Sequence, residues 1–363
     1  MILTRREWLA VPGLVASAGR LAAQSNVHDE IRALAKNAPL RMQFKGGGAE
    51  ECRAWQRSFA AKLGELLGAY QPPARWETIT ERTVELDDHR RDELVLRAEG
   101  HRDLPVHLLT PRGDAGKRPA ILALHGHGRF GYDPVAGVAT TPELRKAIQG
   151  ASYDYGLQLA RRGYVVAVPC LTPFGRRLDS PSSYGGEDPC GVTFVRMQLL
   201  GKVLIAENLR DALWSLELLA SRDNVDAERL GCVGLSYGGR MTMLTSALSS
   251  RVRVAVISGA LNVMQERVQG RYGCGAQVIP GLLEYGDVPE ISSLIAPRPC
   301  LWETGTKDSL MVKGWMETAL DRIRRSYRAF NALDRLQVDS FDGGHRWNGV
   351  VAYPFLDRAL KSA

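Results

Sequence analysis

The stretch RLGCVGLSYGGRM, residues 229–241, decides the fold of this chain of 363 residues. It begins with a short apolar run, which is typical of a buried strand, and continues into a glycine-rich turn that contains Ser236. A helical pattern follows at residues 237–248. A serine between glycines at a strand-to-helix turn is the arrangement of a nucleophile elbow, in which the serine projects above the sheet. The alternative is a serine in an ordinary turn.

Apolar runs on both sides of this stretch predict a mostly parallel sheet. They alternate with helical patterns, and continuous apolar strands between helices are typical of a parallel sheet that helices cover on both faces. The segments expected to be strands are residues 120–126, 164–170, 230–236, 252–259, 299–305 and 335–341. The segments expected to be helices are residues 153–162, 202–220, 237–248 and 312–333, with a closing helix within 348–363.

The first part of the chain has a different pattern. Two helices are expected, at residues 28–38 and 49–69. After the break QPPAR, three extended runs predict an antiparallel N-terminal start to the sheet, at residues 79–86, 93–98 and 106–110. We therefore expect a helical N-terminal extension over residues 24–78 and one α/β domain over residues 79–363.

Composition and charge narrow the class of protein. The chain is 45% hydrophobic and 24% charged, which is ordinary for a globular protein. Its formal net charge is +7, but no block of Lys and Arg lies along one helix with aromatic residues between them. We therefore expect no nucleic-acid partner.

Residues 1–23 have the layout of an export signal. A short basic region precedes a weakly apolar stretch and then small residues, and the apolar stretch is too short to span a membrane. The run TRREWL, residues 4–9, resembles a twin-arginine signal, which exports proteins that are already folded. We expect a periplasmic or secreted protein with no stable insertion in a membrane. The alternative is an ordinary N-terminal helix.

A serine hydroxyl needs a base, and the base needs an acid that orients it. In this architecture the partners follow the serine in the order acid, then histidine. Asp308 lies in the loop after the strand expected at residues 299–305, and His345 lies in the glycine-rich turn after the last strand. Glu303 is the alternative acid, but its place inside the strand favours a buried structural role. We expect a triad of Ser236, Asp308 and His345.

The turn LHGHGR, residues 124–129, follows the first strongly apolar strand. The expected donors to a developing oxyanion are the backbone N–H groups of His127 and of Tyr237, the residue after the serine. His125 and His127, with Asp133 nearby, raise the alternative of a metal site, but two histidines at this spacing are a weak signal. We therefore expect neither a metal nor another cofactor.

The six cysteines include no C-x-x-C pair, which gives little support to a zinc or thioredoxin-like motif. Cys232 and Cys300 fall in expected buried strands, where a free cysteine acts as a small apolar residue. Cys190 and Cys274 fall in expected loops and could form a disulfide in an exported protein. The sequence leaves that pairing open.

Taken together, these motifs resemble an α/β-hydrolase of the dienelactone-hydrolase and acetyl-xylan-esterase-like group. The resemblance rests on LHGHGR, on GLSYGGR, on FDGGHRWNG and on the long run IPGLLEYGDVPEISSLIAPRPCLWETGTKD, residues 279–308. It implies the α/β-hydrolase fold, ester hydrolysis without a cofactor, and the triad roles given above. Dienelactone hydrolases proper use a cysteine nucleophile, so Ser236 indicates the esterase side of the group. Residues 24–78 are outside the resemblance.

The resulting hypothesis is a serine esterase that acts through an acyl-enzyme on small acyl esters, such as acetyl groups on a polysaccharide. A serine peptidase and a non-catalytic binding protein on the same fold are the alternatives. The oligomeric state is left open. Aromatic and basic residues in expected loops could bind the substrate, although surface packing would explain them equally well: Arg129, Phe130, Tyr132, Phe174, Arg176 and Trp347.

Overall fold

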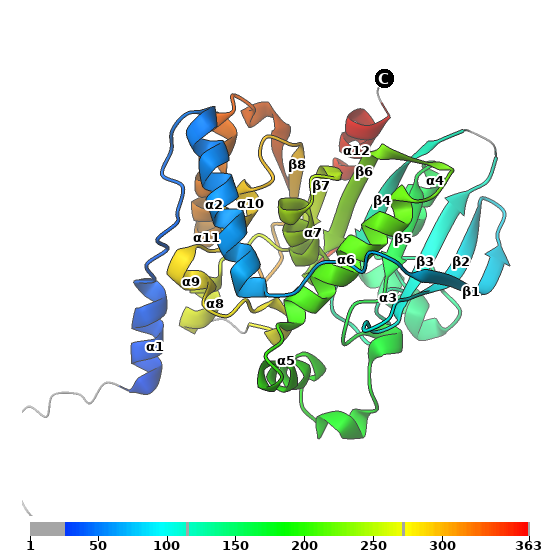
Figure 1. The fold of residues 1–363 in the computed structure, drawn as a ribbon, viewed down its shortest axis with the longest axis horizontal. Coiled ribbons are helices and arrows are strands. Elements are labelled where there is room, and N and C mark those ends of the chain that lie inside the picture. The colour runs from blue at the N-terminus through cyan, green and yellow to red at the C-terminus, as the bar shows by residue number, and fades with distance from the viewer. Residues whose placement is uncertain (1–25, 114–115, 271–272, 362–363) are drawn as a thin grey trace, which may run out of the picture.

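The computed structural model describes residues 26–113, 116–270 and 273–361. Within these ranges the strands form one nine-stranded sheet in the order β1-β2-β3-β5-β4-β6-β7-β8-β9. Figure 1 shows this sheet with helices on both of its faces. The export signal expected at residues 1–23 lies outside the described residues and stays a prediction.

The strands are β1 (Glu77–Glu85), β2 (His89–Arg97), β3 (Leu104–Pro111), β4 (Arg118–Leu124), β5 (Val165–Pro169), β6 (Val225–Leu235), β7 (Val252–Ser258), β8 (Cys300–Gly305) and β9 (Leu336–Phe341). The helices are α1 (Val27–Lys36), α2 (Ala49–Leu67), α3 (Pro142–Ala151), α4 (Tyr155–Arg161), α5 (Pro189–Leu199), α6 (Leu204–Ala220), α7 (Tyr237–Leu248), α8 (Met264–Gly270), α9 (Leu282–Tyr285), α10 (Val288–Ser293), α11 (Lys313–Ala329) and α12 (Ala352–Leu360). Short 3-10 helices are η1 (Gly175–Arg177), η2 (Pro181–Tyr184), η3 (Gly275–Gln277) and η4 (Leu333–Arg335). Among the described residues, no single helix is long and apolar enough to cross a bilayer; α5 and α6 reach that length only as a pair, which bends by 99°.

Strand pairing confirms the expected topology. The pairs β1–β2, β2–β3 and β3–β5 are antiparallel, and every pair from β5–β4 to β8–β9 is parallel. The carboxyl ends of parallel strands meet at one edge of a sheet, which is where open α/β sheets bind their ligands. The turns after β4, β6, β8 and β9 carry the residues expected in the site, and they therefore gather at this edge.

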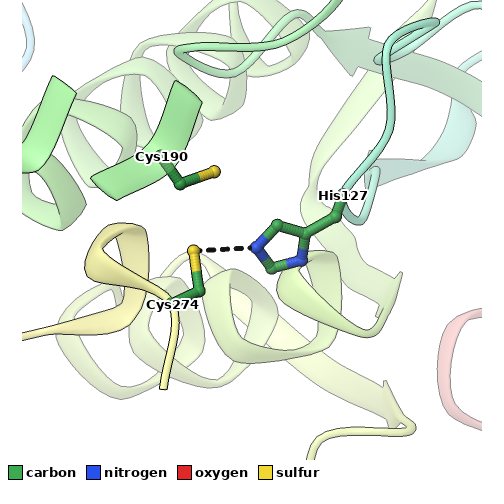
Figure 2. Close-up of side chains that lie close together, drawn as sticks. All are labelled: His127, Cys190 and Cys274. Atoms are coloured by element: carbon green, nitrogen blue, oxygen red, sulfur yellow. Dashed lines mark hydrogen bonds between the residues drawn. The ribbon is translucent and has the colours of Figure 1, made fainter. Parts of the chain in front are cut away.

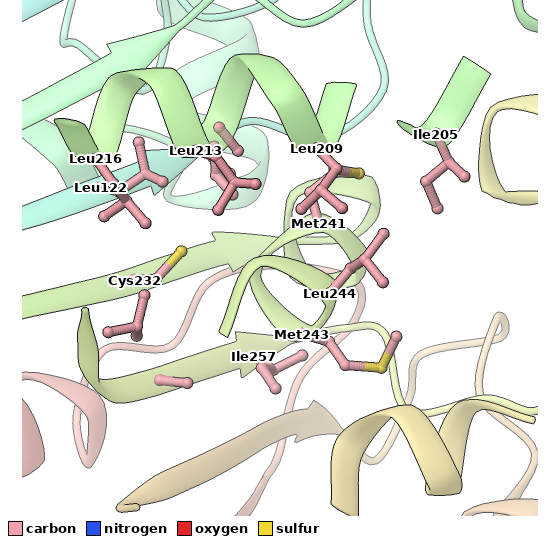
Figure 3. Close-up of a cluster of buried hydrophobic side chains, with 14 of the residues drawn as sticks. Leu122, Ile205, Leu209, Leu213, Leu216, Cys232, Met241, Met243, Leu244 and Ile257 are labelled. Carbon is pink, nitrogen blue, oxygen red and sulfur yellow. The ribbon is translucent and has the colours of Figure 1, made fainter. Parts of the chain in front are cut away.

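Alternate residues of a central strand pack into two separate cores. On β4, Leu122 and Leu124 join one core, and Ile121 and Ala123 join the other. The larger core lies beneath α2, α6, α7, α10 and α11, and Figure 3 shows α6 and α7 packing on the strands around Cys232. The smaller core lies beneath α4 and α12. Burial on both faces explains why these strands are continuous apolar runs rather than alternating patterns.

The helical extension packs on the body of the domain. The Gln56 side-chain amide on α2 donates to the carbonyl oxygens of Ser293, at 3.0 Å, and Ala296, at 2.8 Å, beside the end of α10. The boundary expected at residue 78 falls inside β1, because that strand already begins at Glu77, which pairs with β2. The extension is thus continuous with the sheet through β1, and α2 packs on α10 and α11.

Five helices were not expected from the sequence: α3, α5, α8, α9 and α10. They are short, between 4 and 11 residues, so none carries a long apolar stripe. Three of them do carry a start signal. On α10 it is a capping box of Asp287 and Glu290. Thr141 caps α3 and Asp188 caps α5, and in each case the next residue is a proline at the first helical position.

Candidate active site

Ser236 lies in the sharp turn between β6 and α7, where its backbone has φ 64° and ψ −121°. Residues other than glycine adopt such a conformation rarely. The neighbouring glycines permit a close approach of backbones: a Cβ on Gly238 would lie 1.8 Å from the carbonyl oxygen of Leu124, and one on Gly234 would lie 2.4 Å from the backbone of Gly238. The Ser236 N–H donates to the carbonyl of Ser258 on β7, at 2.9 Å. The turn therefore has the expected strand–elbow–helix form.

Helix α7 begins directly after Ser236 and is 12 residues long. The N–H groups of its first turn have no partner within the helix, and the positive end of its dipole lies beside the serine. The first residue, Tyr237, is buried, and its hydroxyl accepts a hydrogen bond from the Asn208 side-chain amide at 2.7 Å. This end of α7 is therefore a fixed environment that favours negative charge next to Ser236.

Asp308 and His345 come from the two loops that follow β8 and β9. The His345 Nδ1 lies 2.6 Å from the Asp308 Oδ2, and the other carboxylate oxygen accepts the N–H of Leu310 at 2.9 Å. The Asp308 carboxylate is almost wholly buried, so its contacts hold it in one orientation. The second ring nitrogen of His345, Nε2, is buried and has no hydrogen-bond partner among the described residues. One nitrogen of this imidazole is thus fixed by an acid, while the other is available.

Glu303, the alternative acid, lies in β8 and has a different surrounding. Its two carboxylate oxygens accept the backbone N–H groups of Asn348, at 3.0 Å, and Gly349, at 2.8 Å. Burial raises the pKa of this carboxyl above its usual range. Because it ties the backbone three and four residues after His345 to the sheet, Glu303 holds the histidine loop in place.

The site opens into a cavity of about 780 Å³ at the carboxyl edge of the sheet. Ser236, His345 and His127 all lie in its wall. Much of the remaining wall is apolar and comes from segments far apart in the sequence, among them Pro134, Ala151, Val268, Leu310 and Met311. No local pattern marks these residues in the sequence, because they become neighbours only when the loops fold over the sheet.

The turn after β4 packs directly against the serine. A Cβ on Gly126 would lie 2.9 Å from the carbonyl of Leu235 and 3.0 Å from the Cβ of Ser236. The Gly126 N–H donates to the hydroxyl of Tyr153 at 2.5 Å, which fixes the turn. This places His127 beside Ser236 in the cavity wall, where the use of its backbone N–H and that of Tyr237 as oxyanion donors stays a prediction.

Of the six residues named for substrate binding, Phe130 lies in the cavity wall. The other five are absent from that wall: Arg129, Tyr132, Phe174, Arg176 and Trp347. The guanidinium of Arg129 lies over the Phe130 ring, 4.6 Å from its centroid. The Arg176 guanidinium forms an ion pair with the Glu81 carboxylate on β1, at 2.5 Å. This ion pair directs the Arg176 side chain to the antiparallel strands.

Packing explains the aromatic residues that lie elsewhere. Trp347 is buried in the smaller core and stacks on Tyr155, with ring centroids 4.7 Å apart. Phe174 is buried and lies edge-on to His127, with centroids 5.5 Å apart. Tyr132 is buried against the β3 side of the fold, in contact with His107. These three side chains therefore support the walls around the site and do not face the cavity.

The metal alternative built on His125 and Asp133 is not supported by their contacts. His125 is fully buried; its Nε2 accepts the N–H of Leu171 at 2.9 Å, and its Nδ1 lies 2.8 Å from the Gly126 carbonyl. Asp133 binds the Nε2 of His107 at 2.8 Å. Both side chains are engaged in structural hydrogen bonds and do not approach a shared ion with His127.

The contacts of His125 predict an acid-sensitive fold. Burial lowers the pKa of His125 to about 4, because a proton on Nε2 would be desolvated and would displace the Leu171 N–H. The unfolded chain takes up that proton near pH 6.5, so stability falls as the pH drops from about 6.5 towards 4, by up to about 3 kcal/mol. His125→Gln, which keeps an acceptor, is expected to lose less stability on acidification. Denaturant unfolding at pH 7 and pH 4.5 tests this, and equal pH dependence in both proteins would contradict it.

His127 also meets two cysteines. Its Nε2 lies 3.1 Å from the Cys274 Sγ, and the Sγ of Cys190 completes a group whose three atoms lie within 4.8 Å of one another (Figure 2). The pKa of the Cys274 thiol is lowered, chiefly because Cys190 and His127 hydrogen-bond to it. Both cysteines are free thiols in this structure, so the disulfide considered for them is not formed, although the sulfur atoms are close.

Comparisons with known proteins agree on the fold. No family model matches the chain. Over 311 residues it is 29% identical to YtaP of Bacillus subtilis strain 168, which is named as a candidate hydrolase; the alignment covers 82% of this chain and 98% of YtaP. In structure the chain is similar to a Bacteroides fragilis protein named as a candidate acetyl xylan esterase, with 19% identity, a TM-score of 0.74, and coverage of 90% of this chain and 84% of that one. It is also similar to a glucuronoyl esterase from Solibacter usitatus, with 13% identity, a TM-score of 0.62, and coverage of 86% and 93%. These likenesses confirm the expected α/β-hydrolase fold.

Proposed function

We propose that the protein is a serine-dependent carboxylic ester hydrolase that acts through an acyl-enzyme. The observation that carries the proposal is that Ser236 and His345 line the same cavity. Ser236 lies in a strained turn at the start of a helix, and the His345 Nδ1 is held by the buried carboxylate of Asp308. In a triad a hydroxyl, a base and an orienting acid act as one unit, and the shared cavity supports these roles for the three residues.

In the proposed mechanism the Ser236 Oγ attacks the ester carbonyl while the His345 Nε2 accepts its proton. The imidazolium, stabilised by Asp308, then gives that proton to the leaving alcohol. The oxyanion of each tetrahedral intermediate accepts hydrogen bonds from the backbone N–H groups of Tyr237 and His127. Water, activated by His345, finally releases the acid and restores Ser236. No cofactor takes part in these steps.

The proposed substrates are small acyl esters, such as acetyl groups on carbohydrate. Two observations support this class: the structural neighbours are named for esters of xylan and of a sugar acid, and the cavity of about 780 Å³ leaves room for a sugar beside a short acyl chain. The test is hydrolysis of p-nitrophenyl esters of increasing acyl length, next to acetylated xylan. Preference for acetyl esters and release of acetate from xylan are expected. A preference for peptides would favour the peptidase alternative, and failure to hydrolyse any ester would favour a binding protein.

The oxyanion proposal predicts opposite results for two changes at one position. His127→Pro removes the backbone N–H and is expected to lower kcat by about 10²–10³. His127→Ala keeps that N–H and is expected to stay within about tenfold of the wild type. Proline also restricts the preceding residue, so both variants need an unchanged melting temperature. Equal losses of kcat in the two folded variants would contradict the role of the backbone N–H.

We further propose that the protein is exported by the twin-arginine route. The support is the run TRREWL near the start of the sequence. Changing both Arg5 and Arg6 to Lys is expected to leave unprocessed protein in the cytoplasm, as measured by cell fractionation and immunoblotting. Normal export of the double variant would contradict this route.

A further inference from the structure

Three segments that are distant in sequence bring soft donor atoms together beside the cavity. His127 comes from the turn after β4, Cys190 from the first turn of α5, and Cys274 from the residue before η3. Among the residues that the structure describes, this is the one group of three such side chains close enough to hold a metal ion. The proposed hydrolysis uses only the backbone of His127 and neither thiol.

The fold holds the two cysteine segments close together. A Cβ on Gly275, next to Cys274, would lie 2.7 Å from the Cβ of Phe194 and 3.2 Å from the carbonyl oxygen of Cys190. Cys190 and Cys274 are 2% and 5% exposed, respectively. The His127 ring is held between Phe174 and Tyr237, with centroid distances of 5.5 Å and 5.2 Å. The two thiols are therefore positioned by packed elements, and the His127 ring, although exposed, lies against two aromatic rings.

The donor set matches a particular class of ion. One imidazole nitrogen and two thiolates are ligands that Zn²⁺ prefers, and around a tetrahedral ion at about 2.3 Å from sulfur they would lie about 3.5–3.8 Å apart. The 3.1 Å contact between His127 and Cys274, and the 4.8 Å limit for the group, lie on either side of this range. Small side-chain rotations would bring the atoms to ligand distance.

We propose that His127, Cys190 and Cys274 form a binding site for a thiophilic divalent metal ion, with Zn²⁺ as the ion of best fit. Each cysteine loses its thiol proton on binding, and His127 binds through its Nε2. Because His127 and Cys274 lie in the cavity wall, the fourth position of the ion faces the cavity and holds water. The site shares His127 with the proposed oxyanion hole but uses its imidazole and not its backbone N–H, so the test measures metal binding and not ester hydrolysis.

The test uses the full chain, reduced and freed of metal with a chelator. Titration with Zn²⁺ in competition with a chromophoric chelator is expected to show one tight equivalent. Co²⁺ in its place is expected to give thiolate-to-metal absorption in the near ultraviolet. Zn²⁺ is also expected to protect Cys190 and Cys274 from alkylation, with the modified positions mapped by mass spectrometry.

Single changes identify the ligands. Cys190→Ser and Cys274→Ser are each expected to weaken Zn²⁺ binding by more than about 100-fold, since loss of an outer-shell partner alone costs 10–100-fold. Cys52→Ser is the matched control, because Cys52 is equally buried but lies on α2, outside the group. Its affinity should equal that of the wild type. The alkylation map of the wild type decides the question even if a serine variant fails to fold.

Three results would overturn the proposal. One is reduced wild-type protein that binds no Zn²⁺, or in which added Zn²⁺ slows the alkylation of other cysteines and not that of Cys190 and Cys274. Another is an equal loss of affinity in Cys52→Ser. The third is a Cys190–Cys274 disulfide in protein isolated without reductant, seen as a mass lower by two hydrogens, which would show that the pair is a covalent link and not a ligand pair.

Discussion

Ser236→Ala is expected to lower kcat by several orders of magnitude while the fold survives. The hydroxyl is the proposed nucleophile, and members of a triad act as a unit, so loss of one removes most of the contribution of all three. Alanine keeps the Cβ that the turn already accommodates, and the helix that follows needs no side-chain cap from this residue. The melting temperature should therefore change little.

Two measurements test this expectation. Steady-state hydrolysis of p-nitrophenyl acetate gives the loss of kcat, and a fluorophosphonate probe followed by peptide mapping identifies the reactive serine. The label should fall on Ser236 and disappear in the variant. Labelling of another serine, or turnover like that of the wild type in Ser236→Ala, would remove the basis of the proposed mechanism.

Asp308→Asn is expected to lower kcat by about 10⁴, the loss seen when the orienting acid of a triad becomes an amide. The Asp308 carboxylate accepts from His345 Nδ1 at 2.6 Å and thereby keeps the proton on that nitrogen. An amide can instead donate to Nδ1, which moves the proton to Nε2 and leaves the ring unable to accept from Ser236. The side chain keeps its size, so the loss should be chemical and not structural.

Glu303→Gln is the matched control for the acid. Glutamine can accept from only one of the two N–H groups that Glu303 now satisfies, those of Asn348 and Gly349, so stability should fall by about 1–3 kcal/mol. Activity per folded molecule should fall far less than in Asp308→Asn. The reverse order of the two losses of kcat, with both variants folded by circular dichroism, would make Glu303 the acid.

Much of the fold could be predicted because it depends on local pattern. A strand that is buried on both faces must be a continuous apolar run, and the runs in β4, β5, β7 and β8 and in the second half of β6 are visible for that reason. The edge strand β9 is partly exposed and lacks such a run. Gly234 is required by the close backbone of Gly238, and Gly238 by the carbonyl of Leu124 at the end of β4. These glycines on both sides of Ser236 make the turn visible in the sequence as well. Short helices such as α9 and α10 lack the length that makes a periodic pattern stand out.

The neighbours of the site were harder to predict, because they depend on how loops fold over the sheet edge. Arg176 looked like a loop residue that could meet a substrate, but Glu81 on a distant strand attracts it. Trp347, two residues after His345, faces the smaller core and not the cavity. The sequence leaves open a disulfide between Cys190 and Cys274. No local pattern indicates that the His127 side chain lies beside the two sulfur atoms.

The strained backbone conformation of Ser236 also affects how this protein could be engineered for stability. A non-glycine residue held at φ 64° carries a conformational cost of about 1–3 kcal/mol, which the surrounding contacts offset. Glycine would relieve this cost, so selection for heat resistance alone favours a replacement that removes the proposed nucleophile. A library screened only for thermal tolerance would drift towards inactive proteins at this position. Screens of this scaffold should therefore score turnover and melting temperature together.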